Sequence, residues 1–101
     1  MRTIVFFDLP NISYEDRKKY NKFRKFLINE GFIMLQESVY SKITLNSQQA
    51  DFLTNRIYKN SPKKGIIQLL IVTEKQYSEI KNIIGNTNTN IVNDESRLVI
   101  I

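Results

Sequence analysis

A single acidic residue, Asp8, is the side chain of this sequence best placed to take part in chemistry. It stands near the end of an apolar run at residues 3–10, Thr-Ile-Val-Phe-Phe-Asp-Leu-Pro, where a carboxylate is costly unless it meets water, a partner or a cation. The 101 residues include no histidine and no cysteine. A Ser-His-Asp or Cys-His nucleophile is therefore excluded, and a zinc site of the common kind is nearly excluded.

The chemistry open to Asp8 depends on a second carboxylate. Mg²⁺ prefers six oxygen ligands, so one carboxylate does not hold it tightly. A twofold axis beside Asp8 would bring two copies together, and the pair could share Mg²⁺, or Mn²⁺ in its place, and lower the pKa of a bound water for phosphodiester hydrolysis. The alternative is that Asp8 accepts hydrogen bonds from backbone N–H groups of the adjoining turn, and the residues alone favour that alternative.

The other acids are scattered along the chain. Glu15 and Asp16 fall in the first turn of a predicted helix and complement its dipole, while Asp94 and Glu95 precede the last apolar segment. None of them forms the close acidic cluster that a two-metal nuclease requires.

Basic residues gather in two places. The chain has 15 basic and 10 acidic residues, a formal charge of +5. Long basic stripes suit phosphate backbones, which they position without reading the bases, although a solvated helix face is the plain alternative. On a helical wheel three lysines form a stripe opposite the apolar face, two arginines share a flank, and two lysines follow the second helix. These candidate nucleic-acid contacts are Lys18, Lys22 and Lys25, then Arg17 and Arg24, then Lys63 and Lys64.

Periodicity and capping residues predict the elements that carry these side chains. Ser13, Asn46 or Ser47, and Thr73 are the expected helix N-caps, and Gly31 is the expected left-handed residue after the first helix. In the first half of the chain we expect a strand at 3–9, a helix at 14–30, and two short strands or one bent strand at 32–44. A helix from 46 or 47 to about 59, a central strand at 66–72 and a short helix to about 79 should follow. The chain should then end with a brief strand at 80–84, a polar loop at 85–90 and an apolar strand at 97–101.

This order is that of a ferredoxin-like split βαβ fold of the α+β class, with two helices on one face of an antiparallel sheet. We expect a domain at residues 1–84 and a C-terminal loop and strand at 85–101 that pairs across a dimer or with a partner. A second copy of the chain is the simplest cover for the other sheet face. No stretch approaches the ~20 apolar residues that span a bilayer, so we expect a cytoplasmic protein without membrane contact.

Five segments together resemble a known family. They are Val-Phe-Phe-Asp-Leu-Pro at 5–10, Lys-Phe-Arg-Lys-Phe-Leu-Ile-Asn-Glu-Gly-Phe-Ile-Met-Leu-Gln-Glu-Ser-Val-Tyr-Ser-Lys at 22–42, Pro-Lys-Lys-Gly at 62–65, Val-Thr-Glu-Lys-Gln at 72–76 and Arg-Leu-Val at 97–99. The chain resembles the small CRISPR-associated adaptation protein, the Cas2 family, most closely the form from type two (subtype II-A) systems. The segment at 22–42 is the most specific of the five.

The resemblance implies a ferredoxin-like homodimer that works with the CRISPR integrase subunit. In that assembly the small protein bridges two integrase dimers along double-stranded prespacer DNA, which makes it a structural, DNA-binding subunit of the spacer-acquisition complex. The family's first-strand acid corresponds to Asp8. The resemblance also carries an alternative function, a Mg²⁺-dependent endonuclease acting on single-stranded RNA or double-stranded DNA through paired Asp8.

Overall fold

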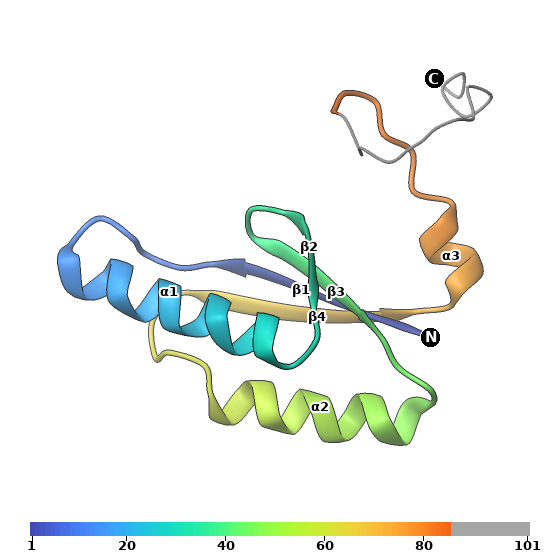
Figure 1. The fold of residues 1–101 in the computed structure, drawn as a ribbon, viewed down its shortest axis with the longest axis horizontal. Coiled ribbons are helices and arrows are strands. Elements are labelled where there is room, and N and C mark those ends of the chain that lie inside the picture. The colour runs from blue at the N-terminus through green and yellow to red at the C-terminus, as the bar shows by residue number, and fades with distance from the viewer. Residues whose placement is uncertain (86–101) are drawn as a thin grey trace.

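The structure of the chain is a computed structural model, and it describes residues 1–85. A strand, a helix, two strands, a helix, a strand and a short helix follow one another (Figure 1). Their bounds are β1 (Arg2–Asp8), α1 (Tyr14–Asn29), β2 (Ile33–Gln36), β3 (Val39–Ile43), α2 (Ser47–Lys59), β4 (Ile66–Val72) and α3 (Glu74–Ser78). The α+β class and the split βαβ order predicted from the sequence are confirmed.

The four strands form one antiparallel sheet in the order β2-β3-β1-β4. Val5 of β1 lies between Tyr40 of β3 and Leu69 of β4. In the sheet formed by residues 1–85, β4 lies at the edge and β1 is inside, so the prediction that residues 66–72 form a central strand is wrong for this part of the chain. The apolar run in β4 arises because both of its faces are apolar, and this pattern does not require strands on both sides.

Each helix begins at the cap that the sequence predicts. The Ser13 hydroxyl accepts a hydrogen bond from the Asp16 N–H at 3.0 Å, and the Asn46 side chain accepts one from the Gln49 N–H at 2.8 Å. Thr73 and Gln76 form a reciprocal capping box at the start of α3. The predicted helix bounds are confirmed to within a residue or two.

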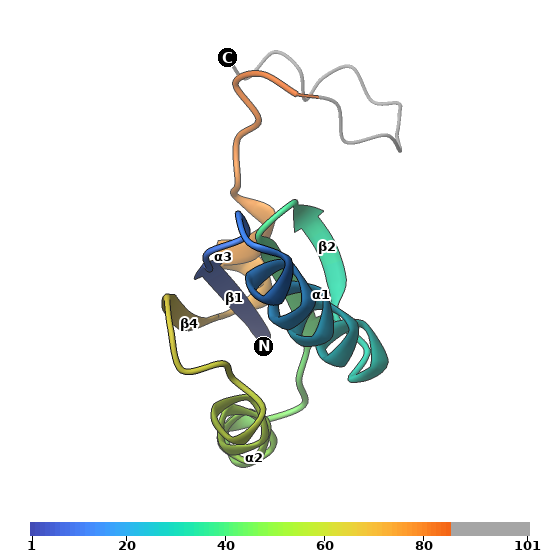
Figure 2. The same ribbon diagram turned by 90° about the vertical axis from the view of Figure 1, so that its left-hand side faces the viewer.

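The hydrophobic core lies on one side of the sheet, under α1 and α2 (Figure 2). Phe7 is central to it, with its ring 5.3 Å from the Phe23 ring in an edge arrangement and 5.7 Å from the Tyr40 ring in a stacked one. The Tyr40 hydroxyl is buried, and no partner for it lies within residues 1–85. The core residues are Val5, Phe7, Leu9, Phe23, Leu27, Phe32, Tyr40, Leu53 and Ile57.

The other side of the sheet is apolar and largely uncovered. Because side chains alternate along a strand, Phe6, Ile43, Ile66 and Leu70 lie on the face turned away from α1 and α2, which we call the open face. Ile43, Ile66 and Leu70 are each more than half exposed. The uncovered face that the sequence predicts is thus present in the single chain.

Helix α3 covers one end of the open face. The Arg2 guanidinium donates two hydrogen bonds to the Glu74 carboxylate, at 2.8 and 3.0 Å, and lies 3.9 Å from the centre of the Tyr77 ring. The hydrogen bond from Arg2 lowers the pKa of Glu74 below its ordinary value and raises the pKa of Arg2. The Tyr77 hydroxyl lies 3.5 Å from the Ser41 hydroxyl. These contacts fix α3 against β1 and β3.

The segment after α3 differs from the prediction. Residues 80–84 do not form the expected strand, and they run away from the sheet (Figure 1). Ile83 and Ile84 are 69% and 92% exposed, so no described strand offers them a partner. The predicted strand at 97–101, and with it the proposed C-terminal unit beyond residue 85, lies outside the described residues. Within residues 1–85, none of the helices is long and apolar enough to cross a membrane.

Candidate acidic site and nucleic-acid interface

Asp8 is the last residue of β1, and the alternation of the strand sets its direction. Val5, Phe7 and Leu9 enter the core under the helices, so Phe6 and Asp8 fall on the open face. Asp8 pairs with Ile66 at the start of β4, and its side chain is exposed. The carboxylate is thus presented at the end of an apolar surface.

The end of β1 is held on both of its sides. On one side the Phe7 N–H donates to the Ser38 carbonyl at 3.0 Å, and the Ser38 hydroxyl lies 3.3 Å from the Tyr20 hydroxyl. On the other side Gly65 comes so close that a Cβ there would lie 2.7 Å from the Asp8 carbonyl oxygen and 2.7 Å from Leu9 Cδ2. Gly65 also has a φ of +99°, which glycine adopts freely. Gly65 therefore lets β4 begin directly against Asp8.

Asp8 belongs to no cluster of metal-ligating side chains in the part of the chain that the structure describes. Within residues 1–85, no three histidine, cysteine, aspartate or glutamate side chains come together in a way that could hold a metal ion. A Mg²⁺ ion needs more protein oxygens than Asp8 supplies, or several waters in their place. The side chains of residues 1–85 therefore do not make such a metal cluster within one chain.

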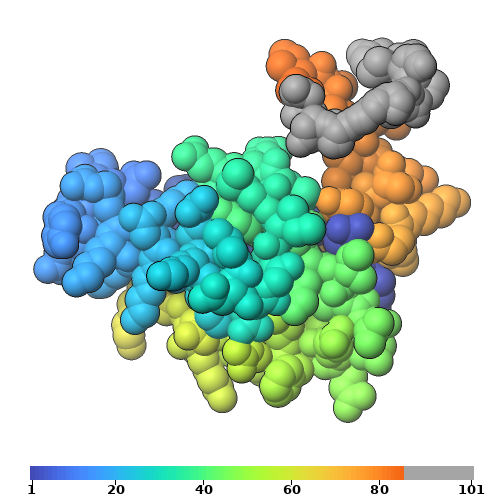
Figure 3. All heavy atoms as spheres, viewed as in Figure 1, coloured from blue at the N-terminus to red at the C-terminus, as the bar shows by residue number. Residues whose placement is uncertain are grey.

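Helix α1 presents a stripe of lysines to solvent. Phe23 and Leu27 of α1 are buried, and positions about 180° around the helix from them point outward. Lys18, Lys22 and Lys25 occupy those positions, and all three are exposed. We call these three residues the outward stripe. In the space-filling view α1 (blue to teal) and α2 (green to yellow) form one continuous surface (Figure 3).

The two predicted arginines share a flank of α1, apart from the outward stripe, as the helical wheel predicts. Arg17 and Arg24 fall on one flank of α1, about 140–160° around the helix from Lys19 on the other flank. Glu30, on the same flank as Lys19, forms an ion pair with Arg56 of α2, so this flank is the one that faces α2. The Arg17 guanidinium donates to the Ile12 carbonyl and fastens the loop before α1. Arg17 thus has a structural contact as well as a charge.

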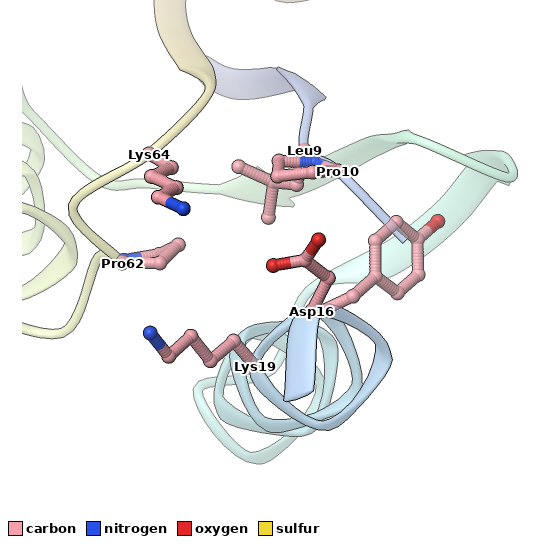
Figure 4. Close-up of a pocket in the computed structure, with 7 residues that line it drawn as sticks. Leu9, Pro10, Asp16, Lys19, Pro62 and Lys64 are labelled. Carbon is pink, nitrogen blue, oxygen red and sulfur yellow. The ribbon is translucent and has the colours of Figure 1, made fainter. Parts of the chain in front are cut away.

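The lysines after α2 come close to α1. Lys64 lines a small pocket together with Lys19 of α1, a residue that the sequence analysis did not select (Figure 4). One lysine of the second predicted basic cluster therefore lies beside α1, although no residue of the outward stripe lines this pocket. Lys19 follows Asp16 by three residues, so the sequence places the two side chains next to each other on the helix. Only the fold shows that Lys19 faces the turn after α2. The pocket is lined by Leu9, Pro10, Asp16, Lys19, Tyr20, Pro62 and Lys64.

Asp8 and the lysines of α1 lie on different sides of the sheet. Asp8 lies on the open face, whereas α1 and the turn with Lys64 belong to the helical side. An antiparallel sheet with a split βαβ order and two helices on one face defines a ferredoxin-like domain.

The particular family follows from comparison with known proteins. The model of the family described as CRISPR associated protein Cas2 matches residues 1–80. The chain belongs to the Cas2 family, as the segments at 5–10 and 22–42 predict.

Relatives share the whole length of the chain. A Treponema denticola protein named CRISPR-associated endoribonuclease Cas2 is 50% identical over 101 residues, which is all of both chains. A Streptococcus mutans protein of the same name is 50% identical over all of this chain and 93% of its own length. The crystal structure of Streptococcus pyogenes Cas2 at pH 6.5 matches with a TM-score of 0.63 at 15% identity, covering 82% of this chain and 99% of that one. This last likeness supports the fold.

Substitution of Gly65 tests whether the contact with Asp8 fixes the end of β1. We expect Gly65→Ala to destabilise the protein by about 2 kcal/mol more than Gly31→Ala, because the new methyl group would meet the Asp8 backbone. Gly31 is a matched control, since its φ is +100° and its Cβ would meet only the flexible Lys42 side chain at 3.5 Å. Urea unfolding of both variants measures the difference. Equal destabilisation would contradict the role given to Gly65.

Proposed function

We propose that this protein is a structural, DNA-binding subunit of the CRISPR spacer-acquisition complex. The observation that carries the proposal is the basic helical side, where the outward stripe and the turn at Lys64 lie on elements that pack around one pocket. Membership of the Cas2 family supports the setting. In this role the protein bridges two dimers of the integrase subunit along the middle of a double-stranded prespacer, which places it in the cytoplasm with the chromosome.

The proposed working unit is a homodimer joined through the open face. Phe6, Ile66 and Leu70 lie on the neighbouring strands β1 and β4 and expose apolar surface on the open face, which water disfavours. A twofold interface uses the same patch on both subunits, so a second copy of the chain covers the first and is covered by it. Because the helical sides then point outward, dimerisation doubles the basic surface, and a rigid core sets the separation of the two integrase dimers.

A charge on the open face tests the dimer. Leu70 is 51% exposed in the single chain, so we expect Leu70→Glu to fold and to sediment as a monomer in analytical ultracentrifugation. The interface would have to bury the new carboxylate without a partner. Leu45→Glu is the control, because Leu45 is 81% exposed at the start of the turn before α2 and lies off the open face. A dimeric Leu70→Glu variant would contradict this interface.

Binding of duplex DNA by the outward stripe follows from its charge and exposure. Lysines that meet phosphates displace condensed counterions, and affinity then falls steeply with salt. Such contacts fix the position of a duplex and carry no sequence information. A prespacer of any sequence can therefore be held, as a spacer-acquisition subunit requires, and no acid of the protein has to take part.

Removal of two charges from the outward stripe tests DNA binding. We expect Lys18→Gln with Lys22→Gln to reduce the slope of log K against log salt by roughly 1.8 for each subunit that meets the duplex, because each lost phosphate contact accounts for about 0.9. Titration of a labelled duplex at several salt concentrations gives the slope. Lys75→Gln with Lys81→Gln removes the same charge from α3 and the segment after it, and should leave the slope unchanged. An equal fall in both double variants would mean that binding depends only on net charge.

A second candidate function is a divalent-metal-dependent endonuclease. The relatives' name, endoribonuclease, favours it, and Asp8 stands exposed on the face proposed to meet a second copy. Asp8 and the partner's Asp8 would hold Mg²⁺, or Mn²⁺ in its place. When bound, such an ion supplies an activated water for hydrolysis of an RNA or DNA phosphodiester. The chain's own part is to hold the carboxylate at the end of β1 through Gly65 and Ser38.

The endonuclease function predicts that cleavage depends on Asp8. We expect Asp8→Ala to remain a dimer and to lose Mg²⁺-dependent cleavage of single-stranded RNA and duplex DNA by a factor of at least 100. The dimer is measured by sedimentation and the cleavage on labelled substrates. The control is Glu79→Ala, which removes an exposed acid just after α3. Cleavage that persists in Asp8→Ala would assign the activity to another site or to a contaminant.

A further inference from the structure

A small pocket separates the start of α1 from the turn between α2 and β4. The amino groups of Lys19 and Lys64 and the carboxylate of Asp16 are directed into the space between these two segments (Figure 4). Leu9, Pro10 and Pro62 form apolar walls, and neither proline has an N–H group to donate. The two lysines are therefore the principal hydrogen-bond donors that a ligand would meet.

The position of both lysines is set by the fold. Lys19 lies on the flank of α1 that faces α2, two residues along from Arg17, which fastens the loop before the helix. Lys64 precedes Gly65, whose backbone is held against Asp8 and Leu9. Both lysines therefore extend into the pocket from backbone that is held in place.

The pocket also contains a charge that opposes an anion. Asp16 is half-buried, and its backbone N–H is engaged by the Ser13 cap. Within residues 1–85 the ion pairs are Arg2–Glu74 and Arg56–Glu30, so neither Lys19 nor Lys64 is joined to Asp16 at ion-pair distance there. The lysines thus remain available, while the carboxylate lowers the positive potential between them.

We propose that Lys19 and Lys64 hold one backbone phosphate of duplex DNA at the mouth of this pocket, and that Asp16 weakens the contact. The inference rests on the proposed DNA-binding function and adds a specific subsite to it. Lys18 and Lys22 of the outward stripe neighbour Lys19 on the helix, so a backbone that crosses the stripe can reach the pocket. Because Asp16 lowers the affinity of the two lysines for the phosphate, this contact positions the duplex without binding it tightly.

A shared phosphate has a signature that independent surface charges lack. If both lysines hold the same phosphate, the double variant Lys19→Gln with Lys64→Gln reduces the salt slope by about 0.9 for each subunit on the duplex, the value of one lost phosphate contact. Each single variant reduces it by less, because the other lysine still meets that phosphate. Lys18→Gln combined with Lys22→Gln is the matched control and should reduce the slope by roughly 1.8 for each subunit, because those lysines meet different phosphates. All four lysines are exposed, and circular dichroism checks that each variant is folded.

Asp16→Asn gives the second measurement. The amide preserves the size of the side chain and leaves the backbone bond to Ser13 in place, so we expect a folded protein that binds duplex DNA about 2–5-fold more tightly. The gain should vanish when Lys19 and Lys64 are both glutamine. Asp51→Asn on α2 makes the same charge change away from the pocket and should leave affinity nearly unchanged.

The outcomes separate this inference from the function beneath it. Failure of the wild-type dimer to bind duplex DNA would overturn both. Binding by the wild type, with a fall in slope of roughly 1.8 for each subunit in the double variant Lys19→Gln with Lys64→Gln and no gain from Asp16→Asn, would overturn the shared phosphate and leave the DNA-binding function standing. Unchanged DNA binding by the double lysine variant, with loss of integrase-subunit binding, would assign the pocket to an acidic side chain of that protein.

Discussion

The alternation of side chains along β1 is the constraint on which the rest of this structure depends. Val5, Phe7 and Leu9 pack beneath α1 and α2, and this packing fixes Phe6 and Asp8 on the opposite face. A shift of one residue in register would bury the Asp8 carboxylate in the core and expose the central Phe7 ring. The aromatic contacts of Phe7 with Phe23 and Tyr40 therefore stabilise the core and also fix the side of the sheet on which Asp8 lies.

This arrangement gives the molecule two chemically different surfaces, one on each side of the sheet. The open face is apolar and bears Asp8, whereas the helical side bears the outward stripe and the pocket between Lys19 and Lys64. Association with a second copy and contact with a phosphate backbone need not compete, because they use opposite sides of the sheet. The same division separates any chemistry at Asp8 from the surface best suited to duplex DNA, which is why the structural role is the leading proposal.

Local signals in the sequence were sufficient for most of the fold. The helix N-caps are predictable because each cap side chain bonds a backbone N–H only three residues further along the chain. These caps are Ser13, Asn46 and Thr73. The edge position of β4 was not readable, because its apolar run reflects two apolar faces and says nothing about its neighbours. Residues 80–84 have the composition of a strand but lack a described partner strand, and pairing is a tertiary property.

The candidate site shows the same limit. Asp8 and the outward stripe follow from periodicity alone, since one strand and one helix define them. Lys19 and Lys64 are 45 residues apart in the chain, and they line one pocket only because α1 lies against the turn after α2. The same placement leaves Arg17 on the other flank of α1. The role of Gly65 likewise appears only when β4 is placed against β1, because a glycine in a turn has many ordinary explanations.

Reconstituted spacer integration tests the central claim most directly. The partner integrase subunit, a prespacer duplex and a DNA target carrying a CRISPR repeat are combined with the wild-type protein or with Asp8→Ala, and integrated product is measured over time. The structural account predicts equal integration by both proteins, because the basic helical side is intact in each. Loss of integration by an Asp8→Ala protein that still forms the dimer and the full complex would contradict it, and would make the carboxylate pair essential to the reaction.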